Sequence, residues 1–203
     1  MRKIFFILLV VFVAVNVRAQ SKHSPSTLYP SYDGLVMAGY QGWFRAANDG
    51  SAAKRYAYGD ESSSSIDAWP DVTEYEKTYE TPFSMPDGSK ARFFSSVDKS
   101  TIDLHFKWMQ EYDVDGVFVQ RFFDVTREGN RKKESSAILR NAMEAASKYK
   151  RAIAVMYDLS GLNAVGEDCS TIIDDWKYLV DELKVTNQKG EKTYLFHRGN
   201  HWL

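Results

Sequence analysis

Side chains that can bind a carbohydrate follow directly after three apolar runs of the chain. The three clusters span Gly39–Trp43, Val119–Phe122 and Met156–Ser160. Amides, guanidinium groups and carboxylates make directional hydrogen bonds to hydroxyl groups, and aromatic rings pack against the apolar face of a sugar. The pattern therefore predicts a sugar-binding site, whose candidate residues are Gln41, Trp43, Asp71, Gln120, Arg121, Tyr157 and Asp158.

Asp158 is the first candidate for a catalytic carboxylate, because it ends an apolar run beside Tyr157. Glycoside hydrolysis uses two carboxyl groups, about 5 Å apart in retaining enzymes and about 6.5–9.5 Å apart in inverting ones. One of the two needs a raised pKa. Asp158 can equally fix the following loop through hydrogen bonds, and Asp71 and Glu74 can be solvated or turn-stabilising acids. The catalytic residues are therefore not assigned, and Asp158 is only a candidate.

Arg121 and Trp43 each allow two interpretations. Arg121 can bind the hydroxyls or a carboxylate of a ligand through several donors, or it can pair with a neighbouring acid such as Asp158. Of the rings of Tyr40 and Trp43, one must pack in the core, because side chains alternate along a strand. Trp43 and Gln41 share a face, so we expect this pair on the ligand side.

Other reactive side chains point to no second chemistry. His105 lies on the apolar face of an expected helix, which favours a hydrogen-bonded packing residue over a catalytic one. His197 and His201 have no carboxylate placed to complete a metal triad. Cys169 is the single cysteine, so no internal disulfide can form, and nothing around the histidines supports it as a nucleophile. We expect neither a metal nor another cofactor.

Alternating strands and helices must position these side chains. Continuous apolar runs predict parallel strands that are covered on both faces, and apolar residues at helical spacing predict helices. The expected strands cover residues 35–44, 117–119 and 152–156. Helices are expected to begin at Ser100, to include residues 138–146 and to begin again at Ser170. A turn at 187–190 and an extended piece at 193–196 should follow the last helix. This order predicts a parallel sheet with right-handed crossovers.

The segment 45–99 separates the first expected strand from the first expected helix. Its residues, such as Ser62–Ser65 and Pro82, are typical of turns rather than of periodic structure. We therefore expect one long functional loop. Ser100 and Asp103 resemble a capping box at the start of the helix.

We expect an α/β fold for residues 20–203. It is an incomplete (β/α)8 barrel of the TIM type, which contains the first three to four βα units. A doubly wound sheet would carry a glycine-rich phosphate turn after its first strand, and Gly39–Gly42 does not match one. A complete barrel needs roughly 200 to 250 residues, and this chain shows only three clear units. In such barrels the C-terminal strand ends form the ligand-binding rim, which is where the three clusters fall.

Residues 1–19 are typical of a secretory signal peptide, with basic Met1–Lys3, apolar Ile4–Val15 and the small Ala19. The apolar run is shorter than the roughly 20 residues of a membrane span. We expect export to a bacterial periplasm, the cell surface or the medium, with no stable membrane span. The rest of the chain is mildly acidic and has no basic block, so we expect no nucleic-acid partner.

Six short motifs occur in order along the chain. They are Gly39–Phe44, Trp69–Asp71, Glu74–Tyr79, Phe94–Asp98, Asp103–Met109 and Asp115–Phe118. Together they resemble the glycoside hydrolase family 71 and 99-like group, some bacterial members of which are labelled xylosidase or arabinosidase. The resemblance implies a (β/α)8 barrel that acts on polysaccharides. It also implies catalytic carboxylates in the later half of the barrel, in a Glu-rich segment that these 203 residues do not contain.

We therefore expect an exported carbohydrate-active protein that resembles glycoside hydrolases, which cleave glycosidic bonds of polysaccharides by carboxylate acid/base chemistry. The chain is expected to stop before the catalytic carboxylates. Its expected partners are a polysaccharide or oligosaccharide and a missing C-terminal half of the barrel. A non-catalytic glycan-binding or vestigial module is the alternative. A second polypeptide that closes the barrel is a third hypothesis.

Overall fold

The computed structural model describes residues 26–53, 55–60, 63–163, 165–166, 168–198 and 200–201. The expected signal peptide at residues 1–19 lies outside this part of the chain. None of the helices within the described ranges is both long enough and apolar enough to cross a membrane.

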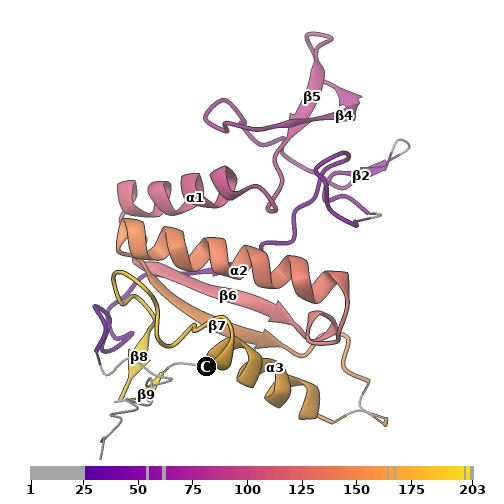
Figure 1. The fold of residues 1–203 in the computed structure, drawn as a ribbon. Coiled ribbons are helices and arrows are strands. Elements are labelled where there is room, and N and C mark those ends of the chain that lie inside the picture. Colours follow the sequence, from indigo (N-terminus) through magenta and orange to yellow (C-terminus); the bar gives the residue numbers. More distant parts are fainter. Residues whose placement is uncertain are drawn as a thin grey trace, which may run out of the picture.

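A parallel sheet of three strands forms the centre of the molecule (Figure 1). The strands are β1 (Met37–Tyr40), β6 (Gly116–Phe122) and β7 (Ala152–Asp158), in the spatial order β1-β6-β7. Tyr194 extends this order, because it forms a parallel bridge to Ile153 of β7. Each later segment is thus added beside the preceding one, and the expected extended piece at 193–196 takes the fourth position.

Three helices cover one face of this sheet. They are α1 (Lys99–Glu111), α2 (Asn130–Tyr149) and α3 (Ser170–Asp181), and a short 3-10 helix, η1 (Phe123–Val125), follows β6. Arg121 of β6 reaches side chains of both α2 and α3. Tyr40 of β1 packs on Phe106 of α1, and it is in register with Val119, two residues before Arg121. Because side chains alternate along a strand, all these contacts lie on the same face.

The side of the sheet on which the helices lie can be compared with the expected barrel. A doubly wound sheet carries helices on both faces, whereas a (β/α) barrel carries all its helices outside the strands. In the described part of the chain, the three long helices lie on one face and the strands follow one another in sequence order. The main core lies between the two layers, with residues such as Ile102, Leu139, Ile153 and Leu179 fully buried.

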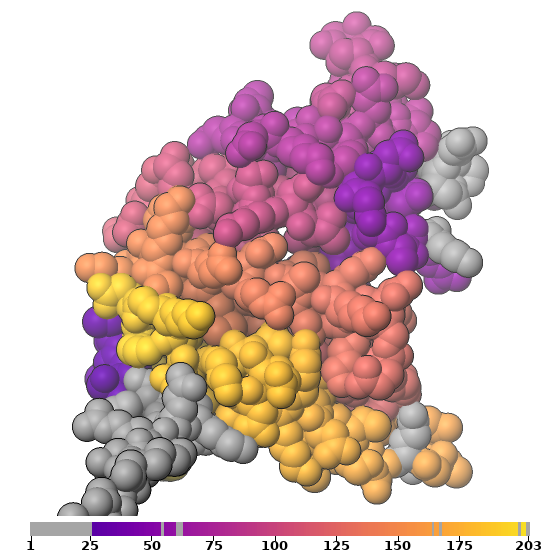
Figure 2. Space-filling model, viewed as in Figure 1, coloured from indigo at the N-terminus to yellow at the C-terminus, as the bar shows by residue number. Residues whose placement is uncertain are grey.

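The segment between β1 and α1 is not the single loop that we expected. It contains two antiparallel hairpins, formed by β2 (Gly59–Asp60) with β3 (Ser63–Ser64) and by β4 (Tyr79–Ser84) with β5 (Lys90–Phe93). Tyr58, Tyr79 and Phe93 belong to a separate buried aromatic cluster at their centre. In Figure 2 this segment, in violet and magenta, forms a mass at one end of the molecule, beyond the orange surface of α2.

Two local expectations were wrong. The first strand ends at Tyr40 rather than at Phe44, because Gly42 adopts a left-handed backbone with φ of 59° and turns the chain away from the sheet. The capping box does not form. Asp98 is the N-cap of α1, but its side chain makes no capping hydrogen bond to the helix and accepts from Lys77 and Tyr79. The Asp103 carboxylate accepts hydrogen bonds from Lys148 of α2 instead.

The first described residues pair with the segment that follows β7. The Thr27 hydroxyl donates to the carbonyls of Lys192, at 2.9 Å, and of Tyr194, at 2.8 Å. The Phe196 amide donates to the Tyr29 carbonyl at 2.9 Å. Figure 1 shows this indigo segment beside the yellow hairpin of β8 (Phe196–His197) and β9 (Asn200–His201). The two ends of the described chain thus lie together beside the fourth strand position.

Gly116 begins β6 where the backbone of β7 comes close. A Cβ atom there would lie 2.2 Å from the carbonyl oxygen of Ala152, so the strands would have to separate. We expect Gly116→Ala to lower the free energy of unfolding by about 1–3 kcal/mol, measured by urea unfolding. Gly39→Ala is the matched control, because a Cβ at Gly39 meets nothing within 4 Å. Equal effects of the two substitutions would contradict this account of the packing.

Candidate functional site

A hollow of about 1100 Å³ lies where the C-terminal ends of the central strands meet the long segment after β1. Gln41 and Trp43 follow β1, Gln120 belongs to β6, and Ser160 and Gly161 follow β7; all five line it. Other lining residues come from the long segment and from the first turns of α2, namely Ala52, Ala53, Arg55, Tyr56 and Ala57 and Arg131, Glu134 and Ser135. The three strand-end clusters predicted from the sequence thus meet at one hollow.

An aromatic pair forms part of this lining. Trp43 stacks on Phe122 with ring centroids 5.4 Å apart and an interplanar angle of 16°. Trp43 remains 54% exposed, so much of its indole is open to a ligand. Tyr40, the neighbouring ring in the sequence, is instead buried against α1, as the strand alternation predicted. Exposed rings of this kind provide apolar surface on which a sugar can pack.

Asp158 and Gln120 bind each other across β6 and β7. The Gln120 amide donates to Asp158, whose second oxygen accepts the Ser160 backbone amide at 2.7 Å. The hydrogen bonds from Ser160 and from Gln120 lower the pKa of Asp158 below its usual value. The group is therefore ionised at neutral pH and suits a role as a hydrogen-bond acceptor or base. It does not have the raised pKa of a general acid.

Arg121 and Tyr157 leave the sheet on the helix side, away from the hollow. Arg121 is 2% exposed and its guanidinium binds Asp175 of α3 through two hydrogen bonds, of 2.5 and 2.8 Å. The Tyr157 hydroxyl donates to the same carboxylate at 2.8 Å. Of the two interpretations of Arg121, the ion pair is the one that the structure forms, with Asp175 rather than Asp158 as its partner. Both residues therefore hold the layers together.

Asp71 is also separate from the hollow. It is exposed, and its carboxylate accepts the backbone amide of Thr73 at 2.9 Å. Hydrogen bonds from Thr73 lower the pKa of Asp71. These contacts agree with the alternative interpretation of Asp71 as an acid that stabilises a turn. Glu74, in the same segment, accepts a hydrogen bond from Trp108 of α1 at 3.2 Å.

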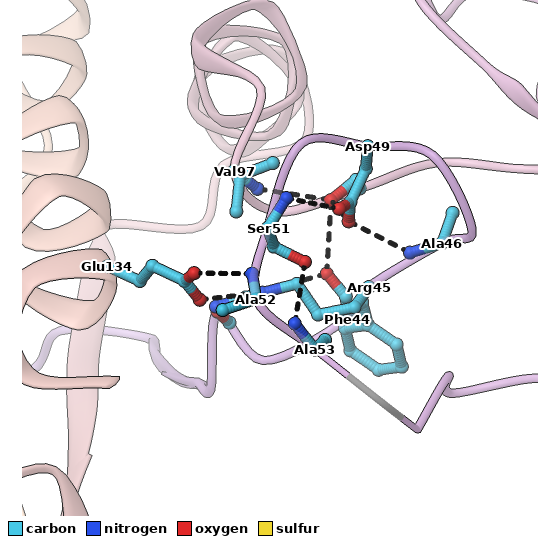
Figure 3. A network of polar contacts seen from close by, with 11 residues as sticks. Phe44, Arg45, Ala46, Asp49, Ser51, Ala52, Ala53, Val97 and Glu134 are labelled. Carbon is cyan, nitrogen blue, oxygen red and sulfur yellow. Dashed lines mark hydrogen bonds and ion pairs between the residues drawn. The ribbon is translucent and has the colours of Figure 1, made fainter. Parts of the chain in front are cut away.

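A buried carboxylate, Asp49, organises the loop that follows Trp43 (Figure 3). Burial raises its pKa, but hydrogen bonds from Ser51, Ser95 and the Ala46 amide outweigh this, so the pKa is lowered overall. The Ser95 hydroxyl lies 2.7 Å from one carboxylate oxygen, and the Ala46 amide lies 3.0 Å from the same oxygen. Asp49 therefore stays charged inside the loop and fixes its shape.

Glu134 connects this loop to α2. Figure 3 shows it reaching from the helix toward Arg45 and Ala52. One carboxylate oxygen accepts the Ala52 amide at 2.8 Å, and the other lies 3.8 Å from the Arg45 guanidinium. Arg45 also donates to the carbonyls of Gly42 and Phe44, at 3.1 and 3.0 Å. These contacts fix the loop that follows Trp43 at Arg45 and at Ala52, and both residues line the hollow.

His105 lies against a second, smaller hollow of about 250 Å³ beside β1. Its ring nitrogens lie 3.0 Å from the Tyr40 hydroxyl and 2.8 Å from the Tyr75 hydroxyl. Burial lowers the pKa of His105 to about 4, so the imidazole is neutral at pH 7. These contacts are those of the hydrogen-bonded packing residue that the sequence favoured.

Several charged residues of the large hollow were not predicted. They are Arg45, Arg55, Asp124, Arg131 and Glu134. They lie in irregular segments, in the short helix η1 or at the start of α2, where no period or motif indicates which way a side chain points. No three residues of the types His, Cys, Asp and Glu lie together as possible metal ligands within the part of the chain that the structure describes.

Comparison of the chain with models of known families, with curated proteins and with solved structures found no match. The assignment of a function therefore depends on the hollow itself and on the motifs along the sequence. What the geometry offers is an exposed aromatic pair, two amides and a set of ionised groups at the ends of parallel strands.

Proposed function

We propose that this protein binds a polysaccharide or oligosaccharide in the large hollow, as the sugar-positioning part of a glycoside-hydrolase-like (β/α) barrel. The observation that carries the proposal is the gathering of Gln41, Trp43 and Gln120 around one cavity at the strand ends. Amides beside an exposed ring match the hydroxyls and the apolar face of a sugar. A volume of about 1100 Å³ accommodates several sugar rings.

The barrel is part of this proposal. It is supported by the order β1-β6-β7 with Tyr194 beside β7, and by the helices on one face of the sheet. It is also supported by the motifs that resemble the family 71 and 99-like group, from Gly39–Phe44 to Asp115–Phe118. Because residues 1–19 are typical of a signal peptide, we propose that the protein acts after export.

A non-catalytic glycan-binding module is the second candidate. It is favoured by the lowered pKa values of Asp158 and Asp71, because a general acid needs a raised value. In the hollow, Asp124 is bound by Arg131 at 2.5 Å. We therefore propose that the described residues bind and position the sugar, and that any acid catalysis uses carboxyl groups outside this set.

Trp43→Ala tests the sugar-binding hollow. Loss of the stacking surface should weaken binding by about tenfold, because an aromatic contact contributes about 0.5–1.5 kcal/mol in addition to the buried area. Binding is measured by calorimetry on a panel of xylan, arabinan, mannan, α-glucan and polygalacturonate oligosaccharides. Tyr112→Ala is the matched control, since Tyr112 is 76% exposed and lies after the end of α1.

The outcomes of this experiment separate the hypotheses. Binding that Trp43→Ala weakens and Tyr112→Ala does not supports the proposal. Release of reducing ends by the wild-type chain would favour the hydrolase over the binding module, and its absence with retained binding would favour the module. No binding to any sugar, or equal effects of both substitutions, would overturn the proposed function.

A further inference from the structure

The charged residues of the large hollow are unevenly paired. Three arginines, Arg45, Arg55 and Arg131, face two carboxylates, Asp124 and Glu134. The whole chain has a formal net charge of −1 at pH 7. The side chains that line the hollow therefore carry one more positive than negative charge, and Asp158, which does not line the hollow, holds a further negative charge at Gln120.

Two of the three arginines already have carboxylate partners. Arg131 binds Asp124 at 2.5 Å. Arg45 lies 3.8 Å from Glu134 and donates to two backbone carbonyls. Each of the two carboxylates that line the hollow is thus matched by one guanidinium. The pairs leave no unmatched negative charge on this wall.

Arg55 is the remaining cation. It is exposed and lines the hollow, and it forms no hydrogen bond or ion pair with other residues in the described ranges. A guanidinium presents its N–H groups in a planar fork that matches the two oxygens of a carboxylate. An unpaired fork in a sugar-sized hollow is therefore suited to an anionic ligand.

Asp158 indicates on which side of the hollow such an anion would lie. Its ionised carboxylate is held by Gln120 on the sheet side, where it would repel a second negative charge. Arg55 lines the hollow from a different element, the segment after β1. Charge and shape thus favour a sugar ring near Trp43, with its acidic group directed toward Arg55.

We propose that the hollow selects an acidic oligosaccharide, with the carboxylate of a hexuronic acid paired to Arg55 and a sugar ring packed on Trp43. This inference rests on the proposed carbohydrate-binding function and names its substrate class. Binding involves no covalent step, and Gln41 and Gln120 supply the hydrogen bonds to hydroxyl groups.

The test compares acidic sugars with the same sugars after reduction of their carboxyl groups. The probes are oligosaccharides of polygalacturonate and of alginate, with their carboxyl-reduced forms and a sulfated galactan, titrated into the full chain by calorimetry. Wild-type protein should bind at least one uronate probe about tenfold more tightly than its reduced form. The affinity should fall as NaCl rises from low to high concentration.

Two substitutions at Arg55 separate charge from shape. Arg55→Gln should weaken uronate binding by about tenfold and leave the reduced sugars unaffected, and Arg55→Lys should restore only part of the affinity, because it lacks the fork. Lys107→Gln is the control, since Lys107 lies on α1 and pairs with Glu111. Thermal unfolding of each variant verifies that the fold is retained.

Each outcome decides the inference. Equal binding of acidic and reduced sugars, or unchanged uronate binding in Arg55→Gln, would overturn the choice of an acidic sugar. If Trp43→Ala still weakened sugar binding in that case, the proposed function would stand. If the sulfated galactan bound more tightly than both uronates, the anionic group of the ligand would be a sulfate, and the assignment of a carboxylate would be overturned. Failure of every sugar to bind would overturn the proposed function as well.

Discussion

Asp175→Ala is expected to lower the free energy of unfolding by about 3–5 kcal/mol, the usual cost of leaving a buried charge without its partner. The Asp175 carboxylate is fully buried and binds the Arg121 guanidinium and the Tyr157 hydroxyl. Its removal leaves Arg121 charged inside the layer between sheet and helices. The Ser135 and Ser136 hydroxyls, at 3.1 and 3.2 Å, cannot neutralise that charge.

The measurement is urea unfolding followed by circular dichroism. Asp174→Ala is the matched control, because Asp174 precedes Asp175 on α3 but its side chain is 73% exposed and, among the described residues, pairs with Lys177 alone. That control should change stability by less than about 1 kcal/mol. If Asp175→Ala is insoluble, the double variant Arg121→Met with Asp175→Leu should fold, because both charges of this buried pair are then removed and Lys132 keeps its partner Glu128. Similar effects of the two alanine substitutions would refute this role of Asp175.

Between pH 6.5 and about 4, His105 should make the protein progressively less stable as the pH falls. Its pKa in the folded chain is lowered from 6.5 to about 4 by burial, so in this window the unfolded chain binds the extra proton. Stability therefore rises with pH through the window, by about 3 kcal/mol in total at 1.36 kcal/mol per pKa unit. Tyr40 and Tyr75 face the ring, and burial raises the pKa of both hydroxyls, that of Tyr75 to about 12.

Urea unfolding at several pH values measures this slope. His105→Gln keeps a hydrogen-bonding side chain but cannot be protonated, so most of the slope between pH 4 and 6.5 should disappear. His197→Gln should retain it. The lowered pKa values of Asp49 and Asp103 add to the slope in the same direction below about pH 5, so the part of the slope between pH 5 and 6.5 is the part that reports on His105. An unchanged slope in His105→Gln would show that another group is responsible.

The strands could be located from the sequence more accurately than the directions of their side chains. The continuous apolar run 117–119 lies in β6, and the run 152–156 lies in β7. Burial alternates along β6 from Val117 to Phe122, but the apolar run in the sequence shows no alternation, so nothing in the sequence indicated that Arg121 and Tyr157 point toward the helices. Gln41 and Trp43, expected on one face of a longer strand, follow the end of β1 instead, and both line the hollow.

The segment between β1 and α1 was harder to predict for a different reason. Tyr79 and Thr81 of β4 are buried while Glu80 and Pro82 are exposed, which is the alternation of a half-buried strand. Pro82 and the turn residues 85–88 masked this pattern. The contacts that position the hollow, such as Asp49 with Ser95, join residues far apart in irregular backbone. Such contacts follow from the packed structure rather than from a local pattern.

The pairing of Thr27 with Tyr194 has a consequence for the order of folding. These residues are 167 positions apart, so this contact can form only after nearly the whole described chain has been made. At about 5–20 residues per second, the segment around Thr27 waits roughly 10–30 s for its partner during synthesis. Contacts of such long sequence separation slow folding. The earliest residues of the described chain are therefore among the last to reach their native contacts.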